Sequence, residues 1–458
     1  MSMPAVRQPP NRQSKGRSPV LSGRPARLGR LLSRLLPALG LALLFLSPPA
    51  AAGDFRRPEF WSAWDPQKPL GRHVILPLGR RPPVRGRDVC TVRLMAVGDV
   101  LIHEPLRLAA ARPEGGYDFR PFFSFLAPLF RQADLVVANL EVPLAGADRG
   151  FSGYPSFNAP TELAADLKAS GVTTLLLANN HSLDRGWTGL EATRAAVEAA
   201  GLDYAGAYAD PQDKARRLVS VNNGLLVALL NYSYGFNGRA GPDPSESWKL
   251  GFIDEEAIFA DLAQARAQGA DFAVVALHFG QEYRLKPDAA QIELAEKLLA
   301  GRPEEGLLGA DLILGAHPHV VQPFAAFNRD GRRQAVVYSL GNFVSNQTAE
   351  HTFIGLLFDA LLTVTPDGRR TVDQVKLIPT WCRRSLVNGR RRYAVVPLAE
   401  AVAAPETYGL ASREAEVMAK RLQALEARLI MTDEAAGGEG PKIEPPAAGR
   451  PDAAEARP

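Results

Sequence analysis

The sequence predicts an α/β fold, because apolar, β-branched-rich runs alternate with amphipathic helical runs from residue 91 onward. Several of the helical runs end at glycine, as a C-terminal helix cap does. Hydrophobic residues make up 46% of the 458 residues. Most of the chain should therefore be globular, with one large core or two ordinary ones.

The expected strands are short apolar runs. They cover residues 92–97, 134–138, 173–178, 225–230, 272–277, 311–315 and 335–340. The expected helices cover residues 161–170, 189–200, 254–268 and 288–300. Beyond residue 350, the runs 353–366 and 371–382 predict a closing β-hairpin around Asp367-Gly368, and one more helix is expected at about 411–430.

The first 52 residues predict a secretory signal. They carry eight basic residues and no acidic one, and they lead through an apolar segment, 35–46, to an Ala-x-Ala end at Ala50 and Ala52. The apolar segment is short for a bilayer, which needs about 20 residues. The long basic region nevertheless leaves an uncleaved N-terminal anchor open. We therefore expect an exported protein, periplasmic or at the cell surface.

The body of the chain is mildly acidic. Without those eight residues, 45 basic and 49 acidic residues remain, a net charge of −4 for residues 53–458. This balance gives no electrostatic case for nucleic acid binding. We expect a lead-in segment at 53–90, a main domain at 91–400, a C-terminal helix at 401–432 and a disordered tail at 433–458.

Two cysteines, Cys90 and Cys382, flank the main domain. In an exported protein they could form a disulfide that ties the two ends of the domain. The alternative is two unpaired, buried thiols, and the sequence leaves both open.

Polar clusters directly follow six of the expected strands. In α/β folds the carboxyl ends of strands form the site, because backbone and side chains converge there. The clusters hold four of the seven histidines and are, in order, Asp99; Asn139 and Glu141; Asn179, Asn180, His181 and Asp184; His278 and Glu282; His317 and His319; and Asn342. Six such clusters in order indicate a single assembled centre.

These residue types suit a pair of divalent metals. A carboxylate can bridge two cations, and neutral imidazoles complete each shell without adding charge. Mixed carboxylate, imidazole and amide ligands suit Mn, Fe or Zn better than an all-oxygen Ca or Mg site. Two metals about 3.5–4 Å apart can activate water and stabilise the leaving oxygen of a phosphoester. His317 and His319 can then bind different metals, with Pro318 stiffening the loop between them.

Six short segments also carry a resemblance to a known family. They are GDVLIH (98–103), NLEVPL (139–144), ANNHSLDRG (178–186), HFGQEY (278–283), GAHPHVVQP (315–323) and YSLGNF (338–343). Their order and spacing resemble those of the CapA capsule-synthesis family, associated with bacterial poly-γ-glutamate synthesis. That family is similar to calcineurin-like metallophosphoesterases and 5′-nucleotidases, which implies a four-layer α/β/β/α sandwich with a two-metal site.

The resemblance also implies residue roles. The implied metal ligands are Asp99 and His319 for the first metal, Asn180, His278 and His317 for the second, and Glu141 as the bridge. His181, oriented by Asp184, would contact the substrate phosphate or protonate the leaving group.

The chain departs from the phosphoesterase pattern at the first metal. Phosphoesterases carry D-x-H in their first motif, whereas Leu101 stands two residues after Asp99. His103 could substitute or could face the substrate. Glu141 replaces the usual bridging Asp. These differences imply a weaker first site or a single metal.

Substrate contacts are expected near the metal ligands, at His103, Asn139, Asn158, Glu282, Gln322 and Asn342. The loops 151–160, with Tyr154, and 233–238 are either substrate loops or rigid packing loops. Plain structural explanations also exist: a strand cap for His317 and His319, a core histidine for His278, and solvated loop positions for Glu282 and Gln322.

Three functions follow. The first is an exported metal-dependent hydrolase acting on a phosphoester or on an amide-linked anionic envelope polymer such as poly-γ-glutamate. The second is a non-catalytic binding module in an envelope polymer-synthesis complex. The third is a nucleotidase. It ranks last, because such enzymes usually need a further domain to clamp the base, and little of the chain follows residue 400.

Overall fold

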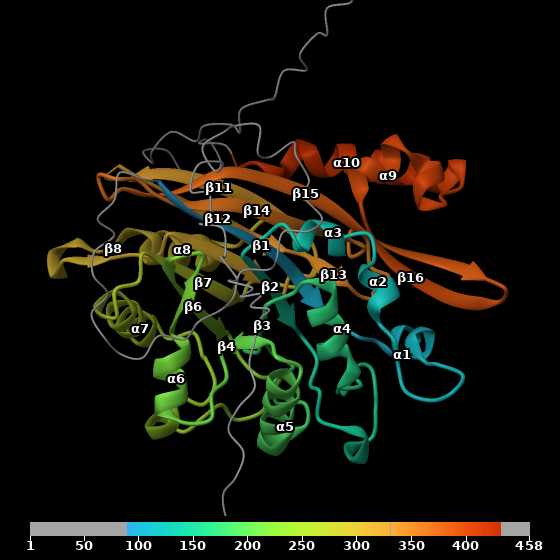
Figure 1. The fold of residues 1–458 in the computed structure, drawn as a ribbon, viewed down its shortest axis with the longest axis horizontal. Helices are drawn as coiled ribbons and strands as arrows, with labels where there is room; N and C mark the ends of the chain where they lie inside the picture. The colour runs from blue at the N-terminus through green and yellow to red at the C-terminus, as the bar shows by residue number, and fades with distance from the viewer. Residues whose placement is uncertain (1–88, 330, 432–458) are drawn as a thin grey trace, which may run out of the picture. The chain divides into compact units, whose positions relative to one another are not determined.

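The computed structural model describes residues 89–329 and 331–431 (Figure 1). The predicted signal or anchor, nearly all of the lead-in segment and the predicted disordered tail lie outside the described residues. Within the described ranges the architecture is α/β, as the alternation of apolar and amphipathic runs predicts.

One mixed sheet of 14 strands forms the centre of the fold, and it contains two parallel sets. The first set is β1 (Cys90–Val100), β2 (Leu135–Leu140), β3 (Thr174–Leu176) and β4 (Asp203–Ala205). The second set is β6 (Leu225–Ser233), β7 (Phe272–His278), β10 (Leu312–Ala316) and β12 (Arg332–Leu340). Most of these strands are buried throughout, which explains their continuous rather than alternating apolar sequences.

Two long strands join the parallel sets. The strand β14 (Ile354–Val364) pairs antiparallel with β1, and β15 (Arg370–Val387) links β14 to β12. The other strands of this sheet are β5 (Val219–Asn222), β11 (Val321–Arg329), β13 (Asn342–Val344) and β16 (Arg390–Pro397). A separate two-stranded ribbon consists of β8 (Gly301–Arg302) and β9 (Leu307–Leu308).

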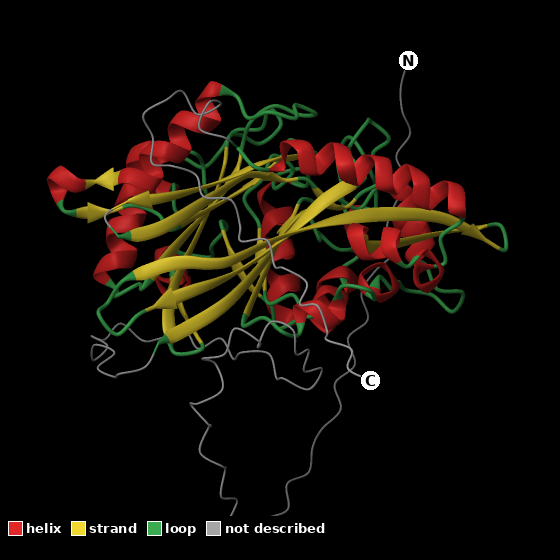
Figure 2. Ribbon diagram, turned by 90° about the horizontal axis from the view of Figure 1, so that it is seen from above, coloured by secondary structure: helices red, strands yellow, loops and turns green. Residues whose placement is uncertain are grey.

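The sheet curls so that its two halves face each other across an apolar core. Leu94 of β1, Val274 of β7, Val337 of β12 and Phe358 of β14 belong to this inner core and are fully buried. Separate cores lie on the two outer faces, one with α4 and α5 and the other with α7 and α8. Helices thus flank the strands on both sides (Figure 2), which confirms the four-layer α/β/β/α sandwich.

The helices begin and end where local chemistry allows it. Asp288 and Gln291 form a capping box at the start of α8, and Gly171 ends α4 in the left-handed conformation. The helices are α1 (Glu104–Ala110), α2 (Arg120–Phe123), α3 (Ala127–Phe130), α4 (Glu162–Ser170), α5 (Gly186–Ala199), α6 (Pro211–Arg217), α7 (Glu255–Ala267), α8 (Ala289–Ala300), α9 (Leu398–Ala403) and α10 (Ser412–Leu429). No helix among residues 89–329 and 331–431 is long and apolar enough to cross a membrane.

The predicted closing hairpin is present as β14 and β15, and Gly368 in its turn has a φ of 86°. The structure extends β15 to Val387, five residues beyond the predicted end, because these residues pair with β16. The C-terminal region then forms α9 and α10, and α10 packs against β11 of the sheet.

The two cysteines are not bridged. Cys90 begins β1, whereas Cys382 lies buried in β15 with its thiol 3.4 Å from the carbonyl oxygen of Ser345. Burial raises the pKa of the Cys382 thiol. The structure therefore has the unpaired alternative.

Candidate metal centre

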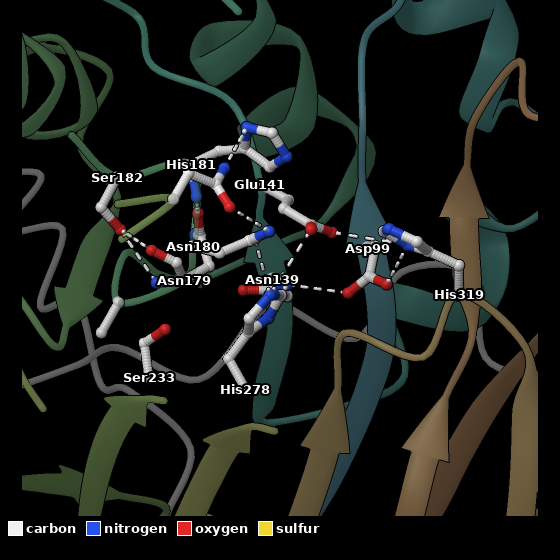
Figure 3. A network of polar contacts seen from close by, with 12 residues as sticks. Asp99, Asn139, Glu141, Asn179, Asn180, His181, Ser182, Ser233, His278 and His319 are labelled. Carbon is white, nitrogen blue, oxygen red and sulfur yellow. Dashed lines mark hydrogen bonds and ion pairs between the residues drawn. The ribbon is translucent and has the colours of Figure 1, made fainter. Parts of the chain in front are cut away.

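The predicted polar clusters meet where the carboxyl ends of the two parallel strand sets converge (Figure 3). Asp99 lies near the end of β1, and Glu141 directly follows β2. His278 ends β7, and the loop after β10 carries His317 and His319. All five side chains are nearly or completely buried.

The backbone around these residues is tightly constrained. The Asp99 amide donates to the carbonyl oxygen of Gly341 at 3.0 Å, and a Cβ on Gly98 would lie 1.8 Å from that oxygen. His317 and His319 have φ values of 96° and 58°. Left-handed backbone is uncommon for histidine, and such strain concentrates at functional sites.

Two groups of side chains present ligand atoms close enough to hold a metal ion, and Glu141 belongs to both. One group contains Glu141, His278 and His317, and the other contains Asp99, Glu141 and His319. Glu141 Oε1 lies 3.4 Å from His278 Nε2, and Glu141 Oε2 lies 3.9 Å from His319 Nδ1. The two oxygens of one carboxylate thus face different groups.

Three asparagines orient these side chains. Asn139 Nδ2 donates to Asp99 Oδ1 at 2.8 Å, and Asn342 Oδ1 lies 3.2 Å from His319 Nδ1. Asn180 Oδ1 lies 2.9 Å from His278 Nε2. Because that nitrogen also faces Glu141, an amide, an imidazole and a carboxylate converge at one point.

Burial sets the charge states of the centre. Burial and the neighbouring Asp99 charge raise the pKa of Glu141 well above its ordinary value. Burial lowers the pKa of His278 to about 3 and that of His317 to about 2, so both imidazoles are neutral. Burial also acts to lower the pKa of His319, but the Glu141 and Asp99 carboxylates raise it to about 9.

The pKa of Asp99 shows the opposite balance to that of Glu141. Burial acts to raise this pKa, but the hydrogen bond and positive charge of His319 outweigh burial and lower it. Asp99 is therefore a buried carboxylate that carries its negative charge.

The donor set fits divalent metals. Neither oxygen of Glu141 accepts a hydrogen bond from the described residues, and the same holds for His317 Nδ1, although all three atoms are buried. Buried polar atoms without partners are rare in native proteins. Neutral imidazoles and carboxylates are the forms that bind metals, and cations would also offset the buried carboxylate charge.

His181 and Asp184 lie beside the two groups. His181 Nδ1 lies 2.8 Å from Asp184 Oδ2, and the same carboxylate oxygen accepts from the Phe157 amide at 2.7 Å. The Phe157 ring meets the imidazole edge-on, with centroids 4.8 Å apart. Asp184 therefore holds the imidazole in one orientation, as a partner of a general acid or base does.

A cavity of about 410 Å³ forms the mouth of the centre. Among its lining residues are His103, His181, Glu282, Tyr283 and His319. Of the predicted site residues, the structure therefore places His103, His181 and Glu282 where a substrate could reach them.

Residues 93–347 match the family of the bacterial capsule synthesis protein PGA_cap. This match covers more than half of the chain. The chain belongs to the PGA_cap family.

Two curated relatives from Bacillus show the same relationship. The chain is 30% identical over 274 residues to the capsule biosynthesis protein CapA of Bacillus anthracis, covering 58% of this chain and 62% of that protein. It is 30% identical over 259 residues to the PGA biosynthesis protein CapA of Bacillus subtilis, covering 56% of this chain and 64% of that protein. The matched segment thus spans less than two thirds of each relative.

Two solved structures are among those that superpose on part of the chain. An NAD nucleotidase from Haemophilus influenzae superposes with a TM-score of 0.40 at 12% identity, covering 74% of this chain and 61% of that one. A calcineurin-like phosphoesterase from Bacillus subtilis gives 0.31 at 11% identity, covering 72% of this chain and 99% of that one.

The chain carries Leu101 where the D-x-H first motif of phosphoesterases has its histidine, and His103 does not take that place. His103 belongs to neither group of potential ligands among the described residues. Its Nδ1 lies 3.2 Å from the Leu101 carbonyl oxygen and 3.3 Å from the Asn346 amide, and burial lowers its pKa to about 4. His103 therefore faces the mouth of the centre instead of replacing the missing ligand.

Two predicted substrate residues have structural environments instead. Asn158 is fully buried, accepts from the Ala145 amide and donates to the carbonyl oxygens of Gly146 and Gly150. All of its polar atoms are thus used to brace its own loop. Gln322 is likewise fully buried.

Gln322 fastens the segment that follows β7. Its amide donates to the carbonyl oxygens of Arg284 and Lys286, and its oxygen accepts from Gln291. The hydrogen bonds of Gln322 and Asn158 are satisfied within the protein, so both side chains brace neighbouring loops, and their substrate contact stays a prediction.

Asn139 and Asn342 are also completely or almost completely buried, and they contact ligand candidates as described above. In the structure they position Asp99 and His319, and their contact with a substrate stays a prediction.

Three further residues contact the site, and the sequence analysis assigned none of them a role. Tyr234 packs on His317 with ring centroids 4.6 Å apart, and Tyr283 lies 6.1 Å from His319. Asn237 Oδ1 accepts from Asn180 Nδ2 at 3.1 Å. Tyr234 and Asn237 lie in the 233–238 loop that the sequence singled out, and Tyr283 closes the segment HFGQEY, so their positions were visible but their roles were not.

Proposed function

We propose that this chain is an exported, metal-dependent protein with a hydrolase-type site, acting on the capsule or envelope polymer that its family serves. Membership in the PGA_cap family supports the proposal that the substrate is a capsule polymer. The Bacillus relatives, which are named for capsule and PGA biosynthesis, favour poly-γ-glutamate as that polymer. The basic and apolar N-terminal sequence supports export.

One observation carries the proposal. Glu141 is fully buried, its two oxygens accept no hydrogen bond from the described residues, and each faces a different set of ligand atoms. A carboxylate bridging two Mn, Fe or Zn ions would satisfy both oxygens. Asp99 and His319 would supply further ligands to one metal. His278, His317 and Asn180 would supply further ligands to the other.

Bound metals would supply Lewis-acid activation of the substrate and of water. The chain's own residues would supply orientation and a proton. Asp184 accepts the Nδ1 proton of His181, which leaves Nε2 free to hold or donate a proton at the mouth cavity. His181 would protonate the leaving oxygen of an ester or the leaving nitrogen of an amide.

The metal content of the purified full-length protein tests this proposal. The protein is prepared without chelators and measured by elemental analysis. About two metals per chain are expected for a site of two ligand groups sharing one carboxylate. His278→Ala should remove the metal of its own group, with Glu293→Gln, an exposed acid on α8, as the control that retains both metals. The absence of metal, even after Mn, Fe and Zn are added back, would overturn the proposal.

A non-catalytic polymer-binding module on the same fold is the second candidate. The position two residues after Asp99 is Leu101, which lines the mouth cavity as an apolar side chain, and His103 does not replace a ligand there. A first metal with fewer ligands favours binding over turnover. Full metal occupancy with saturable binding of poly-γ-glutamate, but no hydrolysis of esters or amides, would select this candidate.

A further inference from the structure

Arginines line the end of the β15–β16 hairpin, which lies beside α1 (Figure 1). Arg390, Arg391 and Arg392 open β16 and are exposed, and Arg384 lies on β15 opposite the next residue of β16, Tyr393. This hairpin lies outside the metal centre, and the proposed function does not use it.

These exposed arginines have no acidic partners. Among residues 89–329 and 331–431, no carboxylate lies within ion-pair distance of Arg390, Arg391 or Arg392. The neighbouring Arg383 is different, because its guanidinium pairs with Glu414 of α10 at 2.9 Å. The hairpin therefore neutralises one arginine and leaves three positive charges open to a ligand.

The strand register places two arginines on the same face. Arg384 is opposite Tyr393, and Leu386 is opposite Arg391. Directly opposed residues share a face, and so do residues two apart along a strand, so Arg384 and Arg391 project to one side. The strand rise places them about 7 Å apart along the hairpin.

Arg384 is held close to the mouth of the metal centre. Its guanidinium donates to the carbonyl oxygens of Ser345 and Gln347, and its Nε is buried without an acceptor among the described residues. Gln347 also lines the mouth cavity. The arginine row thus begins at the edge of the candidate site.

Three adjoining cavities connect the metal centre to the hairpin. The mouth cavity of about 410 Å³ shares Asn346 and Thr348 with a second cavity of about 480 Å³, which is also lined by Arg384 and Arg391. That cavity shares Arg391 with a third, of about 600 Å³, between the arginines of β16 and the residues of α1. Each cavity thus shares at least one lining residue with the next, and we refer to the three together as the track.

We propose that this track binds an extended anionic chain with repeated carboxylates and leads it into the metal centre. The guanidinium group is a planar fork that matches the two oxygens of a carboxylate. Arg384 and Arg391 line the second cavity, and Arg390 and Arg392 join Arg391 at the third. Several arginines spaced along the cavities suit a ligand with many charges in sequence, whereas a small monoanion would need only one. The inference rests on the proposed function, because the metal centre defines the end toward which the chain runs.

The test compares binding of fluorescein-labelled poly-L-glutamate by the metal-loaded full-length protein and its variants, using fluorescence anisotropy. The variant Arg390→Gln/Arg391→Gln/Arg392→Gln should raise Kd at least tenfold. A control that loses the same charge elsewhere, Arg131→Gln/Arg413→Gln/Lys420→Gln, should change Kd less than twofold. The single exposed reversal Arg391→Glu should weaken binding in the same direction and guards against a folding defect in the triple variant.

Equal Kd values for the hairpin and control variants would overturn the track. Tighter binding of labelled polyphosphate than of poly-L-glutamate of equal charge would overturn its assignment to polycarboxylates. Metal analysis of the unmodified protein separates this test from the proposed function. A protein that retains metal but binds poly-L-glutamate without the hairpin arginines refutes the track alone, whereas a metal-free protein that needs them refutes only the hydrolase site.

Discussion

Glu141 Oε1 lies 3.4 Å from His278 Nε2, yet neither Glu141 oxygen accepts a hydrogen bond from the described residues. A buried carboxylate in this state destabilises the protein unless a cation is present. Its surroundings therefore favour metal binding at the expense of the stability of the metal-free fold.

The variant Glu141→Gln should have opposite effects on the two forms of the protein. In the chelator-treated protein it replaces a buried carboxyl group whose pKa is raised well above its ordinary value by burial and the Asp99 charge, so the free energy of unfolding should rise by about 1–3 kcal/mol. In the metal-loaded protein it removes the shared ligand, so metal affinity should fall at least about tenfold. Thermal unfolding with and without added metal measures both effects.

Glu293→Gln is the matched control for that experiment, because Glu293 is 68% exposed on α8 and pairs with exposed Lys297. It should leave Tm nearly unchanged in both forms. If Glu141→Gln lowered Tm equally with and without metal, the carboxylate would have an ordinary structural role.

Asp184→Asn should impair His181 without removing metal. The substitution weakens the bond that fixes the imidazole orientation, so hydrolysis of the model substrate bis(p-nitrophenyl) phosphate should fall by roughly 10²–10⁴-fold. Elemental analysis should give the same metal content as the unmodified protein.

Ser156→Ala provides the comparison, since Ser156 donates to the main-chain carbonyl of Asp184 and does not contact its carboxylate. Its rate should stay close to that of the unmodified protein. Loss of metal in Asp184→Asn would instead indicate that Asp184 supports the metal groups, and the assignment of a proton-transfer role to His181 would lose its support.

The sequence predicted the ordered residues at the strand ends because parallel strands must bring their carboxyl ends together. Asp99, Glu141, His278, His317 and His319 are among the residues that this rule brings together, and the structure places all five in one buried cluster. The resemblance, not the rule, singled them out as ligands. The rule concerns backbone topology, which apolar periodicity reveals.

The direction in which a polar side chain turns does not follow from the same rule. Gln322 lies three residues after His319, yet it binds the carbonyl oxygens of Arg284 and Lys286 on a distant segment. Asn158 similarly closes its own loop. Such partners depend on tertiary packing, so a short motif cannot distinguish a bracing amide from one that meets a substrate.

Long-range pairing also escaped the prediction. The end of β15 and the start of β16 are exposed or half-exposed and rich in arginine, which gives a weak strand signal. They form strands because each satisfies the other's backbone hydrogen bonds. The arginine track proposed above belongs to this part of the fold.

Asp359→Ala should strongly destabilise the protein. Asp359 is fully buried and accepts from Arg93 Nε at 2.9 Å and from Arg93 Nη2 at 2.7 Å, joining β14 to β1. Removing Asp359 takes away the carboxylate that accepts two hydrogen bonds from a buried guanidinium, so the free energy of unfolding should fall by about 3–5 kcal/mol. Urea denaturation measures the change.

An exposed ion pair makes the contrast for that variant. Glu255 and Lys297 are 38% and 46% exposed in their side chains, so Glu255→Ala should cost no more than about 1 kcal/mol. Similar losses for Asp359→Ala and Glu255→Ala would contradict the importance of burial at the β1–β14 pair.

Gly98→Ala should disturb both the fold and the metal centre, because the backbone of β1 approaches Gly341 too closely for any side chain. The new Cβ would lie 1.8 Å from the Gly341 carbonyl oxygen, which is backbone and cannot rotate away. Overpacking of this kind costs about 1–3 kcal/mol or more, and relief requires Asp99 to shift with its strand. Gly235→Ala is the control, since its Cβ meets no atom within 4 Å. We expect urea denaturation and metal analysis to show lower stability and weaker metal binding for Gly98→Ala alone. Unchanged metal binding in a destabilised Gly98→Ala protein would separate the fold from the site, and would show that Asp99 keeps its position without the close contact to Gly341.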